Sequence, residues 1–276
     1  MTAIGLALGA SVLWGVGDFF GGLTSRRLAT LAVVAISQLF GFGGILLVAA
    51  FAGGDFPGLT AIAAAMAAGL AGAIGLAGLY RGMAIGAMGV VAPISASAAV
   101  VPVTVGLARG EQPSALQLAG VALALFGVVL VSLEPGEEWR LSAGVPFALV
   151  AALGFGGYFV FMDRASADDA YWAVVVARGF SSSIALAVAA AWGTLRVGRR
   201  NLPVLVVIGL FDVAANLALA LALNEGYVSL VSVVASLYPV ATVLLAVVVL
   251  HERPARSQAL GGAVALTGVG LIAAAA

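Results

Sequence analysis

One motif occurs twice in this chain at a fixed separation. The pattern Glu-x-Pro-x3-Gln-x2-Gly-x6-Gly begins at Glu111 and again at Glu252, so the two copies are offset by 141 residues. Glycine matches alone carry little weight in a chain with 37 glycines, but the Glu-x-Pro-x3-Gln spacing is specific. Because the offset is about half of the 276 residues, the motif indicates an internal duplication that any fold must accommodate.

The composition shows that the duplicated halves belong in a membrane. Apolar residues make up 63% of the chain and charged residues 9%, and the mean hydropathy is +1.19. Soluble domains contain about 25% charged residues, and a globular protein of this length cannot hide so much apolar surface from water. A net charge of zero argues against nucleic-acid binding, and the absence of cysteine excludes disulfides and thiolate metal sites.

Ten apolar runs of roughly 20 residues, each long enough to cross a bilayer, are separated by short polar breaks. They cover residues 3–24, 30–52, 60–81, 88–108, 114–133, 142–162, 171–195, 202–223, 227–250 and 257–275. We expect a first five-helix repeat at 1–134, a linker at 135–141 and a second repeat at 142–276. Because five is odd, the second repeat enters the membrane from the opposite side. The predicted fold is an all-α membrane protein of ten transmembrane helices in two inverted five-helix repeats.

Several short segments resemble the EamA-type transporters of the drug/metabolite transporter (DMT) superfamily. They are Leu13-Trp14-Gly15, the run from Ala235 to Pro254 followed by Gln258 and Gly261, and a weaker first-half version from Ala92 to Pro113. The resemblance covers nearly the whole chain. It implies ten helices in two repeats, with the fifth and tenth at the periphery and a central cavity among the others. It also implies transport of a small metabolite or drug.

Arginines are distributed unevenly between the two sides of the predicted bundle. The loops after the even-numbered helices contain only Arg109 and Arg164. The loops after the odd-numbered helices contain nine: Arg26, Arg27, Arg81, Arg140, Arg196, Arg199, Arg200, Arg253 and Arg256. The positive-inside rule places these nine in the cytoplasm and both termini outside, in a multi-pass protein of the cell inner (plasma) membrane. The family resemblance implies the reverse orientation, and we follow the charges.

Charged residues inside the spans are the first candidates for a site, because each costs roughly 2.5–3.5 kcal/mol on insertion scales. Asp212 lies near the middle of predicted helix 202–223, with Asn216 one turn further on the same face. Arg178 in helix 171–195 is expected at a similar depth, so it can pair with Asp212. The pair is either a structural clamp or a solute-gated switch. Asp212 itself is either a protonatable, solute-binding carboxylate or a buried structural one.

A second acid, Asp18, lies one turn beyond Trp14 in a glycine-rich part of helix 3–24. Glycines allow another backbone or a ligand to approach closely. The functional interpretation places Asp18 in the cavity, and the alternative is an acid near the interface that is neutralised by Arg26 or Arg27.

Uncharged polar and aromatic residues inside the spans complete the candidate set of cavity residues. Gln38 either faces the cavity or forms an interhelical hydrogen bond. Ser236 either meets solute or bonds a backbone carbonyl, which is the commoner use of serine in a span. Trp14, Tyr158 and Tyr238 either line the cavity or pack. Prolines at 93, 102 and 239 are expected to kink their helices.

The two copies of the Glu-x-Pro motif lie at opposite membrane surfaces in this arrangement. Their near-identical local sequences indicate one structural task performed twice, namely turning a helix hairpin and holding the ends of helices at a gate. Direct contact of Glu111 or Glu252 with solute is the alternative.

The sequence favours a transporter over an enzyme. Hydrolysis or acyl transfer requires a nucleophile with a base within reach, and the single histidine, His251, lies at a helix end. Acids inside the spans are scattered singly, so we expect no metal and no cofactor. The chain has no lysine and therefore no Gly-x4-Gly-Lys motif, so ATP does not drive it directly. We expect a secondary carrier that works by alternating access, and a channel or lipid scramblase is the alternative. The expected partners are lipids and a small-molecule solute, with a monomer or homodimer as the assembly.

If Asp212 carries the coupling proton, Asp212→Asn removes the ionisable group while keeping its size. Uptake driven by a pH gradient in proteoliposomes should then be abolished, whereas folding and solute exchange stay measurable. Gradient-driven uptake that survives in this variant would exclude Asp212 as the coupling site.

Overall fold

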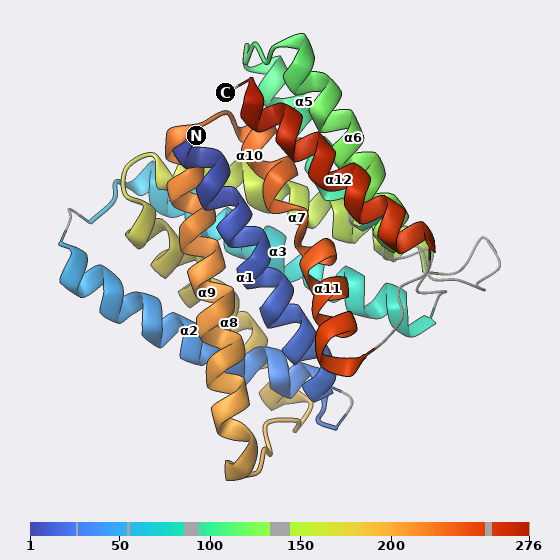
Figure 1. Cartoon of the computed structure of the whole chain (residues 1–276). Helices are drawn as coiled ribbons and strands as arrows, with labels where there is room; N and C mark the ends of the chain where they lie inside the picture. The colour runs from blue at the N-terminus through green and yellow to red at the C-terminus, as the bar shows by residue number, and fades with distance from the viewer. Residues whose placement is uncertain are drawn as a thin grey trace.

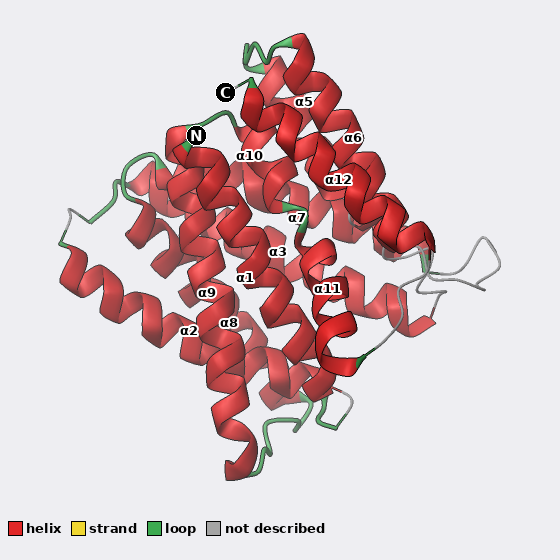
Figure 2. Ribbon diagram, viewed as in Figure 1, coloured by secondary structure: helices red, strands yellow, loops and turns green. Residues whose placement is uncertain are grey.

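The computed structural model describes residues 1–25, 27–53, 56–85, 94–95, 97–132, 144–251 and 256–275, and all regular elements among them are helical (Figure 2). The first half contains α1 (Thr2–Ser25), α2 (Thr30–Ala52), α3 (Leu59–Ile85), the 3-10 helix η1 (Ser97–Ala99), α5 (Val100–Ala108) and α6 (Ala115–Ser132). The second half contains α7 (Val145–Ser166), α8 (Ala170–Ala191), η2 (Arg199–Asn201), α9 (Leu202–Glu225), α10 (Val228–Ala235), α11 (Tyr238–Leu250) and α12 (Arg256–Ala274).

These helices confirm the prediction of an all-α membrane protein with two repeats. Over the described residues, seven helices are long and apolar enough to cross a membrane, and shorter apolar helices at Ser97–Ala108 and Ala115–Leu130 accompany them. Both termini lie at the same end of the bundle (Figure 1). A chain whose two termini lie at the same end crosses the membrane an even number of times, as the ten predicted helices do.

The predicted helix 227–250 is interrupted in the middle. It forms α10 and α11, and the break falls at Ser236 and Leu237, directly before Tyr238 and Pro239. Proline has no N–H to continue the helical ladder and disfavours helical geometry in the residue before it. Pro102, by contrast, lies in the first turn of α5, where no intrahelical donor is lost, and α5 continues through it. The third predicted kink, at Pro93, lies outside the described residues.

Three predicted helix ends are wrong by about a turn. α3 continues to Ile85, and α7 continues to Ser166, so Asp163 lies inside a helix and not in a loop. α8 ends early, at Ala191, because Gly193 adopts φ +65° and its N–H bonds to the carbonyl of Ala190. A left-handed glycine of this kind is a common helix terminator.

The two repeats interlock and do not form separate bundles. The most extensive helix contacts join a helix of the first half to one of the second: α3 with α7, α6 with α12, α1 with α9, and α2 with both α8 and α9. In Figure 1, α1 runs between α9 and α11, and α6 and α12 lie side by side along one edge. Helices α6 and α12 are the two that the family resemblance placed at the periphery.

The glycines of the duplicated motif form the contact between α6 and α12. A Cβ on Gly268 would lie 2.5 Å from the amide nitrogen of Ala124 and 2.6 Å from the carbonyl oxygen of Gly120. A Cβ on Gly127 would lie 2.6 Å from the carbonyl oxygen of Gly261. Each copy's first glycine therefore faces the other copy's second, which is why both positions require glycine.

The glutamine of the motif has a separate role in the first copy. At the start of α6, the backbone N–H of Gln117 donates to Ser114 Oγ at 3.2 Å, and the backbone N–H of Ser114 donates to Gln117 Oε1 at 2.8 Å. This reciprocal pair is a capping box. Gln117 Nε2 also donates to the carbonyl of Ala275 at 3.2 Å, so the cap ties α6 to the end of α12.

The close contact of α6 and α12 predicts that valine is destabilising at one glycine of α12 and tolerated at another. Gly268→Val should lower stability by about 1–3 kcal/mol, because its side chain must force α6 and α12 apart. Gly270→Val is the matched control, since no atom lies within 4 Å of its Cβ position. The measurement is the thermal unfolding midpoint in detergent. Equal loss in both variants would show that valine's helix propensity, and not the close contact, sets the effect.

Candidate functional site

Polar side chains from six helices meet in the middle of the bundle. We call this group the central polar cluster, and its members are Asp18 on α1, Gln38 on α2, Tyr158 on α7, Arg178 on α8, Asp212 and Asn216 on α9, and Tyr238 on α11. Every one of them is a residue that the sequence singled out as a cavity candidate.

An ion pair lies at the centre of this cluster. Arg178 Nη2 is 2.8 Å from Asp212 Oδ2, as the predicted depths of the two residues allowed. Asn216 Nδ2 donates to the backbone carbonyl of Asp212 at 2.5 Å, and the Tyr158 hydroxyl donates to Asn216 Oδ1. The side chains of Arg178 and Asp212 remain 13% and 29% exposed, so the pair is only partly buried.

Gln38 is held against α8 by two hydrogen bonds from serines. Ser181 Oγ donates to Gln38 Oε1 and Ser182 Oγ donates to the Gln38 backbone carbonyl, both at 3.3 Å. Ser181 lies one turn from Arg178 on the same helix. Gln38 therefore forms the interhelical hydrogen bond that was one of its two interpretations, and this bond places it beside the cluster.

Asp18 is accessible on the side of α1 that faces the protein interior. It shares a helical face with Ala7, Ser11 and Trp14, and Ala7 and Ser11 are only 0% and 3% exposed. The lipid-facing side of α1 is different and carries Val12, which is 53% exposed. The side chain of Asp18 is nevertheless exposed. The inner face of α1 is thus closed near its N-terminus and open near Asp18.

Aromatic rings border the cluster around Trp14. Its ring centroid lies 6.1 Å from that of Phe159 and 6.5 Å from that of Tyr238, both in edge-to-face geometry. The rings of Tyr158 and Phe159 are 6.1 Å apart. The sequence singled out the Trp and both Tyr residues but not Phe159. The repeat offset of 141 could have indicated Phe159, because it aligns Phe159 with Asp18.

Ser236 lies in the break between α10 and α11. It is buried, and its hydroxyl donates to the carbonyl of Ser232 at 2.7 Å. This is the backbone bond that was the alternative to a solute contact. It satisfies a carbonyl next to the break.

The end of the bundle that carries the loops after α2, α5, α7 and α9 is held together by polar contacts between the repeats. Glu111 of the first repeat accepts hydrogen bonds from the amides of Val228 and Ser229, at 2.8 and 3.2 Å, in the first turn of α10. The first N–H groups of a helix have no partner within the helix, and the helix dipole attracts a negative charge there. Glu111 is therefore a cap supplied by the other repeat.

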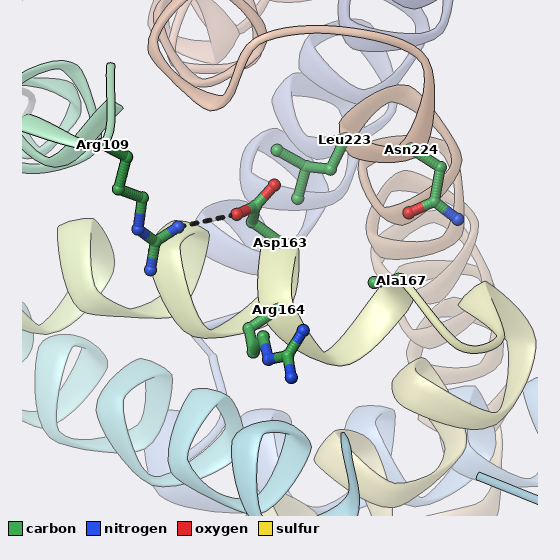
Figure 3. Close-up of a pocket in the computed structure, with 6 residues that line it drawn as sticks. All are labelled: Arg109, Asp163, Arg164, Ala167, Leu223 and Asn224. Carbon is green, nitrogen blue, oxygen red and sulfur yellow. Dashed lines mark hydrogen bonds and ion pairs between the residues drawn. The ribbon is translucent and has the colours of Figure 1, made fainter. Parts of the chain in front are cut away.

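Further contacts join the same end. Arg109 pairs with Asp163 at 2.9 Å, and the Gly58 amide donates to Asp168 Oδ2 at 3.3 Å. A pocket of about 680 Å³ lies here, away from the central polar cluster, and is lined by Arg109, Asp163, Arg164, Ala167, Leu223 and Asn224 (Figure 3). Arg164 points away from the Arg109–Asp163 pair (Figure 3). The two arginines that line this pocket are the two that the sequence analysis assigned to the arginine-poor side of the bundle.

The chain is similar to a known family of transporters along almost its whole length. The sequence profile of the EamA-like transporter family matches residues 1–133 and again residues 142–274. No curated protein matches the chain. A solved crystal structure, described only as that of a protein, is similar over 98% of this chain and 95% of its own. The TM-score is 0.80 and the identity 16%, so this likeness concerns the fold alone.

The ion pair predicts a particular pattern of stability changes. Arg178→Met leaves the Asp212 carboxylate without its cation. Removal of one partner of a buried pair costs about 3–5 kcal/mol, and we expect the lower part of that range because Asp212 is partly accessible. The double variant Arg178→Met/Asp212→Leu should recover most of this loss, since no charge is then left unpaired. Thermal unfolding of both single variants and the double variant measures the coupling. Additive losses would mean that the pair does not stabilise the fold.

Proposed function

The chain belongs to the EamA-like transporter family, and from that premise we propose that it is a secondary carrier of a small metabolite or drug-like solute. In this proposal the solute binds at the central polar cluster, and the two repeats move against each other to expose the cluster to one side of the membrane at a time. The family consists of transporters and not enzymes.

The observation that carries this proposal is the contrast between the two ends of the bundle. Asp18 and the Arg178–Asp212 pair are accessible, whereas Ala7 and Ser11 on the same face of α1 are sealed. The sealed direction leads to the end where Glu111 caps α10, and the pocket of about 680 Å³ at that end is lined by no member of the central polar cluster. A solute site open to one side and closed to the other is the arrangement that alternating access requires.

The closure at that end consists of contacts that can reverse. A carboxylate on two backbone amides and a partly exposed Arg109–Asp163 pair are polar contacts, which water can replace when the end opens. The positive-inside rule makes the open end cytoplasmic, and the reverse orientation makes it external. Neither orientation decides between import and export.

The coupling ion in this proposal is the proton, with Asp212 and Asp18 as the groups that can bind it. Exchange without a coupling ion is also compatible with the same site. A channel or scramblase of this architecture is the alternative function. Saturable counterflow in proteoliposomes supports a carrier, and unitary conductance in a planar bilayer contradicts one.

The Glu111 cap allows alternating access to be tested before the solute is known. Glu111→Gln removes the charge at the start of α10, an interaction worth about 1 kcal/mol, which changes a two-state population about fivefold. The chain has no cysteine, so single cysteines report cleanly. Maleimide labelling of Leu223→Cys, buried at the capped end, should rise several-fold, and labelling of Gly21→Cys, half-buried towards the other end, should fall.

Glu225→Gln is the matched control, because it removes a carboxylate that is exposed at the same end. It should leave both labelling rates unchanged. A joint rise at both cysteines in the Glu111→Gln background would indicate a continuous pore, and no change at either would show that the cap does not set the equilibrium. The joint rise contradicts the proposed carrier, and the absence of change contradicts the proposed closure by Glu111.

A further inference from the structure

We propose that the central polar cluster selects organic amines that carry a single positive charge and an apolar, preferably aromatic, body. The ammonium group would bind Asp18, and the body would lie against Trp14 and Tyr238. This assignment rests on the proposed function and names the class of solute. It follows from the charges, the accessibility and the ring geometry of the cluster.

The charges of the cluster do not balance. Arg178 and Asp212 neutralise each other at 2.8 Å, and the remaining members other than Asp18 are uncharged amides and phenols. Asp18 has no hydrogen bond or ion pair within the part of the chain that the structure describes. The charged group that acts on it is Asp212, which has the same sign. With both acids ionised, the cluster therefore carries one unmatched negative charge.

An unmatched carboxylate at this depth needs a cation. A charge inside the membrane region is costly unless it is paired or hydrated, and the accessibility of Asp18 provides the route by which a cation can reach it. A solute with its own carboxylate is less suitable. Its anionic group would have to displace Asp212 from Arg178 or lie close to two like charges.

The surroundings of Asp18 suit an organic cation better than a metal ion. Trp14 lies one turn from Asp18 on the same helical face, and the Tyr238 hydroxyl is within electrostatic range of the carboxylate. Trp14 meets Phe159 and Tyr238 edge to face, and because Phe159 is only 4% exposed, the half-buried Trp14 and Tyr238 present the more accessible rings. Aromatic faces attract ammonium groups through their quadrupole and also bind apolar surface. No group of three or more His, Asp or Glu residues is assembled as metal ligands in the described ranges.

A matched series of probes separates charge from shape. Phenethylamine, phenylalanine and 3-phenylpropionate share one aromatic body and are a cation, a zwitterion and an anion at neutral pH. We expect phenethylamine to bind the purified wild-type protein at least tenfold more tightly than either of the others, measured by isothermal titration calorimetry. Equal or weaker binding of the amine, including no binding of any probe, overturns the assignment without any variant.

Two variants locate the amine site. Asp18→Asn should weaken phenethylamine binding by about tenfold or more, the equivalent of losing about 1.4 kcal/mol. Glu225→Gln, which neutralises an exposed acid outside the cluster, should leave it unchanged. Trp14→Leu should weaken binding severalfold through loss of the ring face. Amine binding that is insensitive to Asp18→Asn overturns the assignment.

The same probes separate this inference from the proposed function. Amine binding that depends on Asp18 but produces no counterflow would contradict the proposed carrier function and support the proposed amine site. Counterflow that favours phenylalanine or 3-phenylpropionate would leave the carrier and overturn the amine class. If Asp18→Asn abolishes only pH-gradient-driven uptake of those two solutes, Asp18 is a proton site and the amine assignment fails.

Discussion

The ion pair between Arg178 and Asp212 is the interaction around which the interior of this protein is arranged. Two opposite charges can remain in the membrane region because each neutralises the other at 2.8 Å. The pair joins α8 to α9, and Asn216 and Tyr158 extend it to α7. These three helices belong to the second repeat. Because Arg178 is used in this way, Asp18 on the first repeat has no cationic partner among the described residues, and the specificity that we propose follows from that imbalance.

The scaffold around the pair depends on close packing between the repeats. Apolar side chains gain little by leaving lipid, so membrane helices associate through close backbone approach and polar contacts. Both devices are present, in the glycine contacts of α6 with α12 and in the cap that Glu111 places on α10. The duplicated motif supplies each of them. It therefore specifies how the halves hold together, and the unduplicated residues specify what the centre can bind.

Much of this arrangement could be predicted from the sequence, because bilayer thickness limits the length of an apolar run and offset matches reveal a repeat. Depth counting along α8 and α9 brought Arg178 beside Asp212, and helical periodicity put Asn216 on the same face. Other features depend on tertiary contacts that no local pattern contains. The exposure of Asp18 on an inner face, the Glu111 cap and the position of Phe159 arise from how the halves meet. The predicted helix ends were wrong near Gly193, whose left-handed conformation ends α8, and near Asp163, which pairs with Arg109 of the other repeat.

The position of the Glu111 cap has a consequence for turnover. A carrier cycles quickly only if its two end states have similar free energies, because a large difference traps it in one of them. Random mutation does not by itself keep the free energies of the two end states equal. A motif present in both copies can maintain it, since the sequence predicts Glu252 at the opposite surface in the same local sequence as Glu111, although Glu252 lies outside the described residues. A cap of equal strength at each surface would contribute equally to both closed states and cancel from their difference. The resting preference of the protein would then be set by its unmatched residues, such as Asp18 and Arg178, and could be altered by one substitution without weakening either closure.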